Sequence, residues 1–144
     1  MFCLFIILHL SEGGQNVNRT LHVSLNKSLK SMENKLALRT GSGIRFICYD
    51  DIIYCKADGR YTQVFLRNGK SVITARLLKS FEHKLPDDMF LRIHKSHIIN
   101  LRYITNYSSS NNGYLVLGTN TRLDVSKRKR KSLLEKLDSI FTFV

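Results

Sequence analysis

Cysteine is scarce in this chain of 144 residues, which contains only Cys3, Cys48 and Cys55. An odd, sparse set with no close CxxC pair argues against a disulfide scaffold and is typical of a protein kept in a reducing compartment. A metal site has little more support. The spacing of Cys48 and Cys55 matches no zinc pattern, and His94 and His97 fall in a stretch that is predicted to be strand and tight turn. The sequence therefore predicts no metal and no cofactor.

Acidic residues are also few: 11 Asp and Glu stand against 23 Lys and Arg, which gives a formal net charge of +12. The pairs Asp50–Asp51 and Asp87–Asp88 fall at the ends of predicted elements, where Asp is favoured for turns and helix caps. Ser96 stands beside two histidines, but no nucleophile elbow, Gly-rich phosphate loop or oxyanion hole accompanies it. These features argue against an enzyme. The positive charge favours an anionic partner, with nucleic acid ahead of an acidic membrane surface; a purely solubilising surface is the alternative.

Hydrophobic runs long enough to cross a membrane are missing. The apolar N-terminus Met1–Leu10 is about half the length of a transmembrane helix, and no Lys or Arg precedes it as in a signal peptide. The segment has three interpretations: a buried strand or helix, a weak membrane anchor, or an upstream piece whose natural partner has been cut away. We favour the last. We expect a cytoplasmic protein and leave weak membrane association through Met1–Leu10 open.

The Gly-Ser-Gly break at Gly41–Gly43 divides the chain into two regions of different composition. Residues 1–42 hold the apolar segment and a polar stretch. An amphipathic linker helix is predicted in that stretch from a stripe at helical spacing, formed by Leu25, Leu29, Met32 and Leu36. Residues 43–144 are predicted to form a single domain.

Short alternating stretches bounded by turn residues predict antiparallel strands over most of residues 43–144. The pair Asn68–Gly69 predicts a tight hairpin, since both residues tolerate positive φ. One internal helix is predicted through Leu77–Leu85 and is ended by Pro86. A last helix is predicted after Ser126, with a buried face made of Leu133, Leu134, Leu137 and Ile140. The predicted fold is mostly β with short helices.

The positive charge is concentrated in the last third of the chain, where Asp124 is the only acid between Phe90 and Lys131. The run SKRKRK lies at the start of the last predicted helix, where the helix dipole makes each cation unfavourable by about 0.3–1 kcal/mol. An anion bound at that helix start would offset this cost, because free backbone N–H groups there also bind phosphate. The position of the run, as well as its sign, favours nucleic acid over a solvated charge run.

The stretch FLRIHKSHIINLRYI, residues 90–104, sets polar and cationic side chains between strand-like hydrophobic positions. Arg and Lys bind phosphates or guanine edges, and His, Ser and Asn donate or accept at phosphates and bases. Short turns on a β scaffold could carry these groups into a groove. Single residues in this stretch could instead have a purely structural role. We expect Asn100 to satisfy backbone groups of a turn rather than a base, and His97 could equally be half buried.

Three stretches together resemble a known family. FLRIHKSHIINLRYI resembles the F-x-R-x-H-[RK]-S signature of the LytTR-type DNA-binding domain, DDIIYCKADGRYTQVFLRNGK its opening segment and LDVSKRKRKSLLEKL its closing segment. The match spans roughly Ile44 to Leu137, in the family's order and spacing. The resemblance implies an elongated β fold of small antiparallel sheets whose loops enter successive major grooves of bent DNA. Members are usually output domains of bacterial two-component response regulators that bind paired repeats in promoters.

The resemblance also assigns contact residues. The first loop carries Asp58, Gly59, Arg60 and Tyr61; the second Arg92, His94, Lys95 and Ser96; the third Ser126, Lys127, Arg128 and Arg130. Lys95 and Lys127 are expected to reach base edges, whereas Arg92, Ser96 and the remaining basic residues are expected to hold phosphates. The chain departs from the family pattern where Lys56 replaces a common acid, Asp124 a common Pro and Lys127 a usual Arg. Lysine lacks the bidentate guanidinium of arginine, so the resemblance gives weaker support for guanine recognition at Lys127.

The sequence thus predicts a transcriptional regulator that binds double-stranded DNA sequence-specifically and has no catalytic activity. A homodimer on repeated half-sites and an upstream receiver domain are further expectations of the resemblance, and residues 1–42 cannot themselves be a receiver. The alternative is a basic membrane-surface or protein-interaction module that uses the apolar N-terminus and the SKRKRK run together.

Overall fold

The computed structural model describes residues 25–26, 29–30 and 32–144, and the chain forms two compact units, Met1–Lys35 and Leu36–Val144. The apolar segment Met1–Leu10 lies outside the described residues, and the predicted linker helix lies partly outside them and stays a prediction. Its last expected residue, Leu36, is not helical: it lies in a strand and is buried. By its internal contacts the second unit begins at Leu36. The domain boundary that the Gly-Ser-Gly break predicts at Gly43 stays a prediction. No helix in the described part of the chain is long and apolar enough to cross a membrane.

Strands dominate the second unit, as predicted. In chain order they are β1 (Lys35–Thr40), β2 (Gly43–Cys48), β3 (Ile52–Asp58), β4 (Tyr61–Leu66), β5 (Ser71–Thr74), β6 (Phe90–His94), β7 (His97–Asn100), β8 (Ile104–Ser108), β9 (Tyr114–Leu117) and β10 (Arg122–Asp124). The helices are α3 (Leu78–Glu82) and α4 (Lys127–Ile140), with the 3-10 turns η1 (Tyr49–Asp51) and η2 (Leu101–Tyr103).

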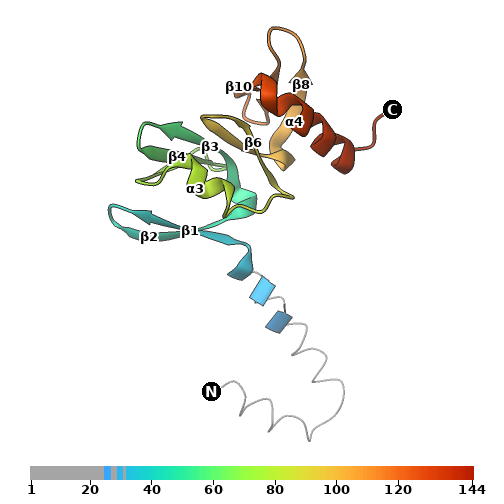
Figure 1. Ribbon diagram of the computed structural model, residues 1–144. Helices are drawn as coiled ribbons and strands as arrows, with labels where there is room; N and C mark the ends of the chain where they lie inside the picture. The colour runs from blue at the N-terminus through green and yellow to red at the C-terminus, as the bar shows by residue number, and fades with distance from the viewer. Residues whose placement is uncertain (1–24, 27–28, 31) are drawn as a thin grey trace, which may run out of the picture. The chain divides into compact units, whose positions relative to one another are not determined.

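The strands form three small sheets (Figure 1). The largest has five strands in the order β5-β4-β3-β7-β6, and every neighbouring pair in it is antiparallel. The other sheets are β1-β2 and the antiparallel β10-β9-β8. This arrangement confirms the prediction of a mostly β fold made of small antiparallel sheets with short helices.

Two hydrophobic clusters cover the two faces of the five-stranded sheet. Because successive strand residues point to opposite faces, Cys55 joins the cluster that includes β1 and α3, whereas Tyr54 joins the cluster with the third sheet and α4. A bulge between Ile52 and Tyr54 shifts the register of β3 against β4. On the second face, Tyr54 and Phe65 stack with ring centroids 4.3 Å apart.

The hairpin predicted at Asn68–Gly69 connects β4 and β5. Gly69 has φ of 78°, and Asn68 accepts a 3.0 Å hydrogen bond from the Lys70 N–H through its side chain instead of adopting positive φ. The prediction for the last helix was partly wrong. Leu133 and Leu137 are buried, but Leu134 and Ile140 are 42% and 45% exposed, because α4 presses only a narrow stripe against the sheet and ends at Ile140.

The two described cysteines differ in environment, which predicts selective alkylation. Cys55 is fully buried and its burial raises the pKa of the thiol to about 12, whereas Cys48 is half-buried. Iodoacetamide at mildly alkaline pH should therefore modify Cys48 in the folded protein and spare Cys55 until denaturant is added. Peptide mass spectrometry on a Cys3→Ser variant measures this. Equal labelling of both thiols in the native state would contradict the buried position of β3.

Candidate nucleic-acid interface

Three turns meet at one end of the five-stranded sheet. The β3–β4 turn follows Asp58, which pairs with Tyr61. The β6–β7 turn adjoins it, because His97 pairs with Lys56 on β3 and the Ala57 N–H donates a 2.9 Å hydrogen bond to the Ser96 carbonyl. The segment before α4 is tied to the same end. These three turns are the three loops that the sequence predicts as contact loops.

The first turn presents exposed side chains on a backbone that requires glycine. Gly59 has φ of 56°, a conformation that other residues adopt only with strain. Arg60 and Tyr61 follow it, both exposed, and Tyr61 at the start of β4 is 52% exposed as a residue. An exposed cation next to an exposed aromatic ring is suited to contacts with phosphate and sugar.

The second turn is held together by its own side chains. The Ser96 N–H donates to Nδ1 of His94 at 3.2 Å, so the neutral His94 ring carries its proton on Nε2. The Arg92 guanidinium donates to the carbonyls of His94 at 3.3 Å and Lys95 at 2.9 Å. Lys95, at the tip, is exposed. The turn is thus preorganised around one outward-pointing cation.

Glu82 of α3 completes this arrangement from outside the turn. Its Oε2 lies 2.7 Å from Nη1 of Arg92, and Oε1 lies 3.9 Å from Nζ of Lys129 on α4. The hydrogen bond from Arg92 holds the pKa of Glu82 below its usual value. The sequence predicts a phosphate contact for Arg92, but this guanidinium already has protein partners on all three nitrogens. These bonds use three of the five guanidinium N–H groups and hold the second turn in place, and the phosphate contact of Arg92 stays a prediction.

Replacing Glu82 by Gln should reduce discrimination between specific and non-specific DNA by about tenfold, because the turn that carries Lys95 loses its charged support. Because the substitution removes one negative charge, the affinity for non-specific DNA should at the same time stay equal or rise. Competition binding with both DNA types measures the ratio. Glu135→Gln is the matched control, since among the described residues Glu135 pairs only with exposed Lys131 at 3.9 Å. If the ratio of specific to non-specific affinity is unchanged in Glu82→Gln, the ion pair between Glu82 and Arg92 is not needed for DNA discrimination.

The third turn leads into α4. The Ser126 N–H donates a 2.9 Å hydrogen bond to the Ile93 carbonyl, which ties the helix start to β6 beside the second turn. The Ser126 side chain does not cap the helix, and no acid lies in the first turn. Lys127 and Arg128 are exposed there. The first two cations of the run expected at this helix start therefore face outward, and the Ser126 side chain leaves the first backbone N–H groups of the helix uncapped.

Arg130 differs from its neighbours. Its guanidinium donates to the Asn112 carbonyl in the β8–β9 turn, and a Cβ on Gly113 would lie only 3.1 Å from its Nε. Gly113 has φ of 74° as well, so both the close approach and the backbone require glycine. Arg130 therefore holds the β8–β9 turn against α4 through one guanidinium nitrogen, while its Nε has no hydrogen-bond partner within the described residues. Its phosphate contact stays a prediction.

His97 lies beside the second turn, with its ring centroid 5.7 Å from that of His94. Burial lowers the pKa of His97, and His94 and Lys56 lower it further, whereas Asp124 acts in the opposite direction. His97 is half-buried, as the sequence allowed, and at neutral pH it adds no charge to this end of the sheet.

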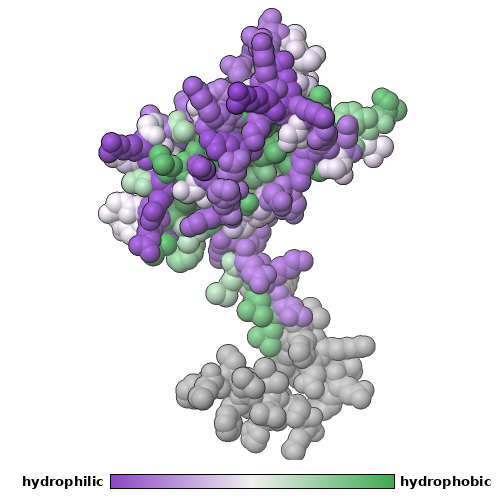
Figure 2. Space-filling model, viewed as in Figure 1, coloured by the Kyte–Doolittle hydropathy of each residue, from purple (hydrophilic) through white to green (hydrophobic). Residues whose placement is uncertain are grey.

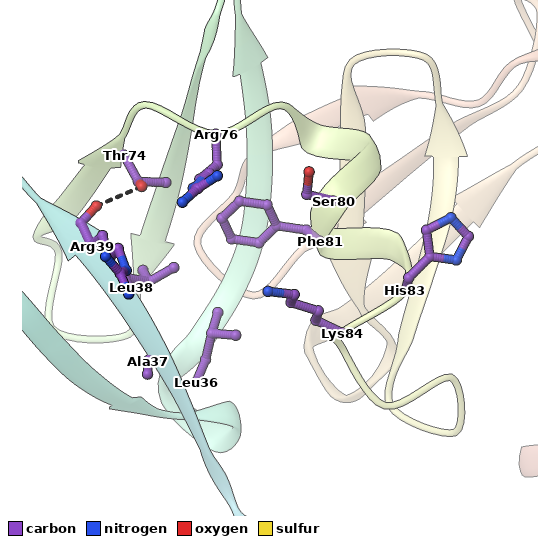
Figure 3. A pocket seen from close by; sticks show the side chains of 10 residues that line it. All are labelled: Leu36, Ala37, Leu38, Arg39, Thr74, Arg76, Ser80, Phe81, His83 and Lys84. Atoms are coloured by element: carbon purple, nitrogen blue, oxygen red, sulfur yellow. Dashed lines mark hydrogen bonds between the residues drawn. The ribbon is translucent and has the colours of Figure 1, made fainter.

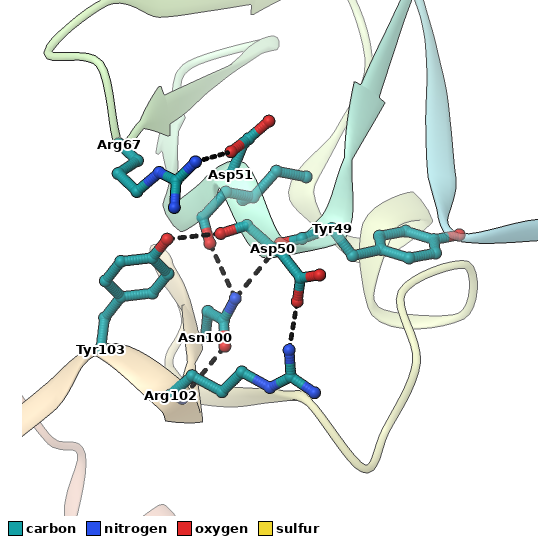
Figure 4. Close-up of polar contacts among 8 residues, drawn as sticks. Tyr49, Asp50, Asp51, Arg67, Asn100, Arg102 and Tyr103 are labelled. Atoms are coloured by element: carbon teal, nitrogen blue, oxygen red, sulfur yellow. Dashed lines mark hydrogen bonds and ion pairs between the residues drawn. The ribbon is translucent and has the colours of Figure 1, made fainter. Parts of the chain in front are cut away.

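The opposite end of the sheet holds paired charges (Figure 4). Arg67 and Asp51 lie 3.0 Å apart, and Arg102 pairs with Asp50. Asn100 lies between them with its side chain fully buried: Nδ2 donates to the carbonyls of Tyr49 at 3.2 Å and Ile52 at 2.9 Å, and Oδ1 accepts from the Arg102 N–H at 3.0 Å. The predicted structural role of Asn100 is confirmed.

The three turns therefore bring together the exposed predicted residues at one end: Gly59, Arg60, Tyr61, Lys95, Lys127 and Arg128. Figure 2 shows hydrophilic residues over most of the upper part of the view, where β10 and the start of α4 lie in Figure 1. The half-buried residues Arg92, His94, Ser96, Ser126 and Arg130 lie beneath or beside them. Sequence reasoning missed Glu82, since no local pattern connects it with an arginine ten residues later. It also left Lys56 out of the site, although Lys56 is exposed next to the second turn.

Comparisons with known proteins identify the family to which the chain is similar. The sequence profile of the LytTr DNA-binding domain matches residues 42–138. The sensory transduction protein LytT of Bacillus subtilis is 28% identical over 127 residues, which cover 85% of this chain and 51% of LytT. The CO-responsive transcriptional regulator RcoM of Rhodospirillum rubrum is 31% identical over 83 residues, 58% of this chain and 35% of RcoM. The chain thus spans about half or less of the length of these relatives.

A solved structure has the same fold. The LytTr DNA-binding domain of a Bacillus cereus protein superposes with a TM-score of 0.64 at 24% identity, over 72% of this chain and 96% of that domain. LytT of Bacillus cereus is 31% identical over 109 residues, which cover 72% of this chain and 43% of that protein. With a family profile that matches most of the second unit, the chain belongs to the LytTR family of DNA-binding domains.

Proposed function

We propose that the chain regulates transcription by binding double-stranded DNA sequence-specifically, with its three turns in successive major grooves. The observation that carries this proposal is the pairing of β3 with β7 and of Ser126 with Ile93, which brings three separate cationic turns to one end of a sheet. At the other end, Arg67 and Arg102 are paired with Asp51 and Asp50. The exposed cations of the three turns outnumber Asp58, the exposed acid of the first turn, and an excess of positive charge is what a phosphate backbone requires.

The exposed residues divide into two roles. Lys95 and Lys127 stand at the tips of the second and third turns, and we assign them to base edges. Arg60 and Arg128 are assigned to phosphates, where they fix register without carrying sequence information. The relatives named above are a sensory transduction protein and a transcriptional regulator, which supports a regulatory role. A homodimer on repeated half-sites and a receiver domain in the whole protein belong to the same proposal.

Selection of bound duplexes from a random pool tests binding and specificity together, and enrichment of one motif is expected. If about six side chains neutralise phosphates, log K for that motif should fall with log salt at a slope of about −5. Anionic lipid vesicles are the comparison, since the alternative function, a basic membrane-surface module, predicts vesicle binding. A flat salt response on DNA, or tight vesicle binding without DNA selection, would refute the proposal.

A further inference from the structure

A hollow of about 400 Å³ lies between β1, the end of β5 and helix α3 (Figure 3). Its volume falls in the range of ligand sites for small molecules. One wall is held in place by Thr74, which is buried and whose Oγ1 donates a 2.6 Å hydrogen bond to the Arg39 carbonyl of β1. The hollow is therefore part of the folded unit and does not depend on a loose loop.

The floor of the hollow is apolar. Figure 3 shows the Phe81 ring projecting from α3 toward β1, with Leu36 and Leu38 on the strand below it. All three side chains belong to the same hydrophobic cluster and are held by packing on their other sides. All three are buried, so an aromatic or aliphatic group placed here would contact the small part of each side chain that still faces the hollow.

The rim is cationic and lacks a counter-charge. Arg39, Arg76 and Lys84 line the hollow together with His83, and no acid is among the lining residues. Within the described part of the chain, the side chains of Arg39, Arg76 and Lys84 have no ion pair. By contrast, Arg67, Arg92 and Arg102 each pair with a carboxylate. Like charges gathered around one hollow repel each other, and a bound anion would reverse the sign of that interaction.

We propose that this hollow, which we call the β1–α3 pocket, binds a small organic anion with a flat apolar body, such as an aryl carboxylate or aryl phosphate. The apolar part would lie on Phe81 and the anionic group between Arg39 and Arg76. A DNA backbone fits less well, because it offers phosphates but no apolar group to occupy a concave floor. The pocket adjoins the first turn, since Thr62, next to Tyr61, donates a 2.7 Å hydrogen bond to the Arg76 carbonyl.

The test is an NMR titration of the whole chain with 1-naphthoate as probe. Amide signals of Leu38, Arg39 and Phe81 are expected to shift, and the Arg39→Gln/Arg76→Gln double variant should bind at least about tenfold more weakly. Arg67→Gln/Arg102→Gln carries the same charge change at the opposite end of the sheet and should bind like the native protein. Unshifted spectra elsewhere show that each variant is folded.

Further probes separate the parts of the proposal. 1-Naphthyl phosphate should bind at the same amides, whereas neutral 1-naphthalenemethanol and inorganic phosphate should each bind much more weakly. If the neutral alcohol binds as tightly as 1-naphthoate, the cations of the rim do not contribute to binding. If inorganic phosphate binds as tightly as 1-naphthoate, the apolar floor does not contribute. If naphthoate fails to bind while a DNA duplex shifts these amides and the double variant loses DNA affinity, the rim belongs to the DNA interface and the proposal is wrong. Because naphthoate binding needs no DNA, it can fail or succeed independently of the proposed function.

Discussion

Replacing Asn100 by Ala is expected to lower the free energy of unfolding by about 2–4 kcal/mol. The side chain is fully buried and bonds to three backbone groups. Its loss removes all three bonds: the Tyr49 carbonyl keeps the bond from the Ile52 N–H, whereas the Ile52 carbonyl and the Arg102 N–H lose the partner that this side chain provides. These groups belong to Tyr49, Ile52 and Arg102, and they join η1, β3 and η2 at one corner of the sheet (Figure 4). Urea unfolding followed by circular dichroism measures the change.

Asn106→Ala is the matched control for this prediction. Asn106 lies exposed in β8, so the same chemical change should alter stability by less than about 0.5 kcal/mol. Folded Asn100→Ala protein should still bind DNA, since Asn100 lies at the end of the sheet opposite the three turns. A loss of stability below about 1 kcal/mol would show that the corner is held by other contacts.

Neutralising Lys95, Lys127 and Arg128 together with Gln is expected to weaken DNA binding by about two to three orders of magnitude at physiological salt. Each of these exposed side chains should displace condensed counterions from DNA, so the salt slope should become less steep by roughly three units. Stability should change little, because none of the three makes an ion pair within the described residues. Fluorescence anisotropy at several salt concentrations gives both quantities.

The control carries the same change in net charge at the opposite end of the sheet: Arg67→Gln, Lys70→Gln and Arg102→Gln. The two ion pairs that it removes are solvent-exposed and contribute little to stability. A long-range effect of net charge would weaken binding equally in both variants. Equal losses would therefore assign DNA binding to the overall charge of the chain and not to the three turns.

The strands could be predicted because alternation and turn chemistry are local. Asn68–Gly69 marks a hairpin by itself, and Leu133 and Leu137 show helical spacing. Leu36 was assigned to the wrong element because it fits two patterns: the helical stripe of the preceding residues and the alternation of a strand with Leu38. In the structure it lies in a strand, where it packs in the hydrophobic core. Leu134 and Ile140 were expected to be buried because periodicity gives the apolar face of a helix but not the width of the surface that covers it.

The three turns were predicted as contact loops from the family pattern, but the pattern did not predict which of their residues have protein partners. Arg92 and Arg130 are cations in contact loops, and sequence gives no reason to separate them from Lys95 and Arg128. Their partners, Glu82 and the Asn112 carbonyl, come from other elements of the fold. The tertiary arrangement shows which cations have protein partners; which of them contact DNA stays a prediction.

The most direct measurement is the set of backbone amides that shift in the NMR spectrum when the selected duplex is added. Binding through the three turns predicts shifts concentrated at Gly59–Tyr61, Lys95–Ser96 and Lys127–Arg128, with Asn68–Gly69 and Arg102 unchanged. Shifts centred on Asn68–Gly69 and Arg102, or scattered over both ends of the sheet, would contradict the account.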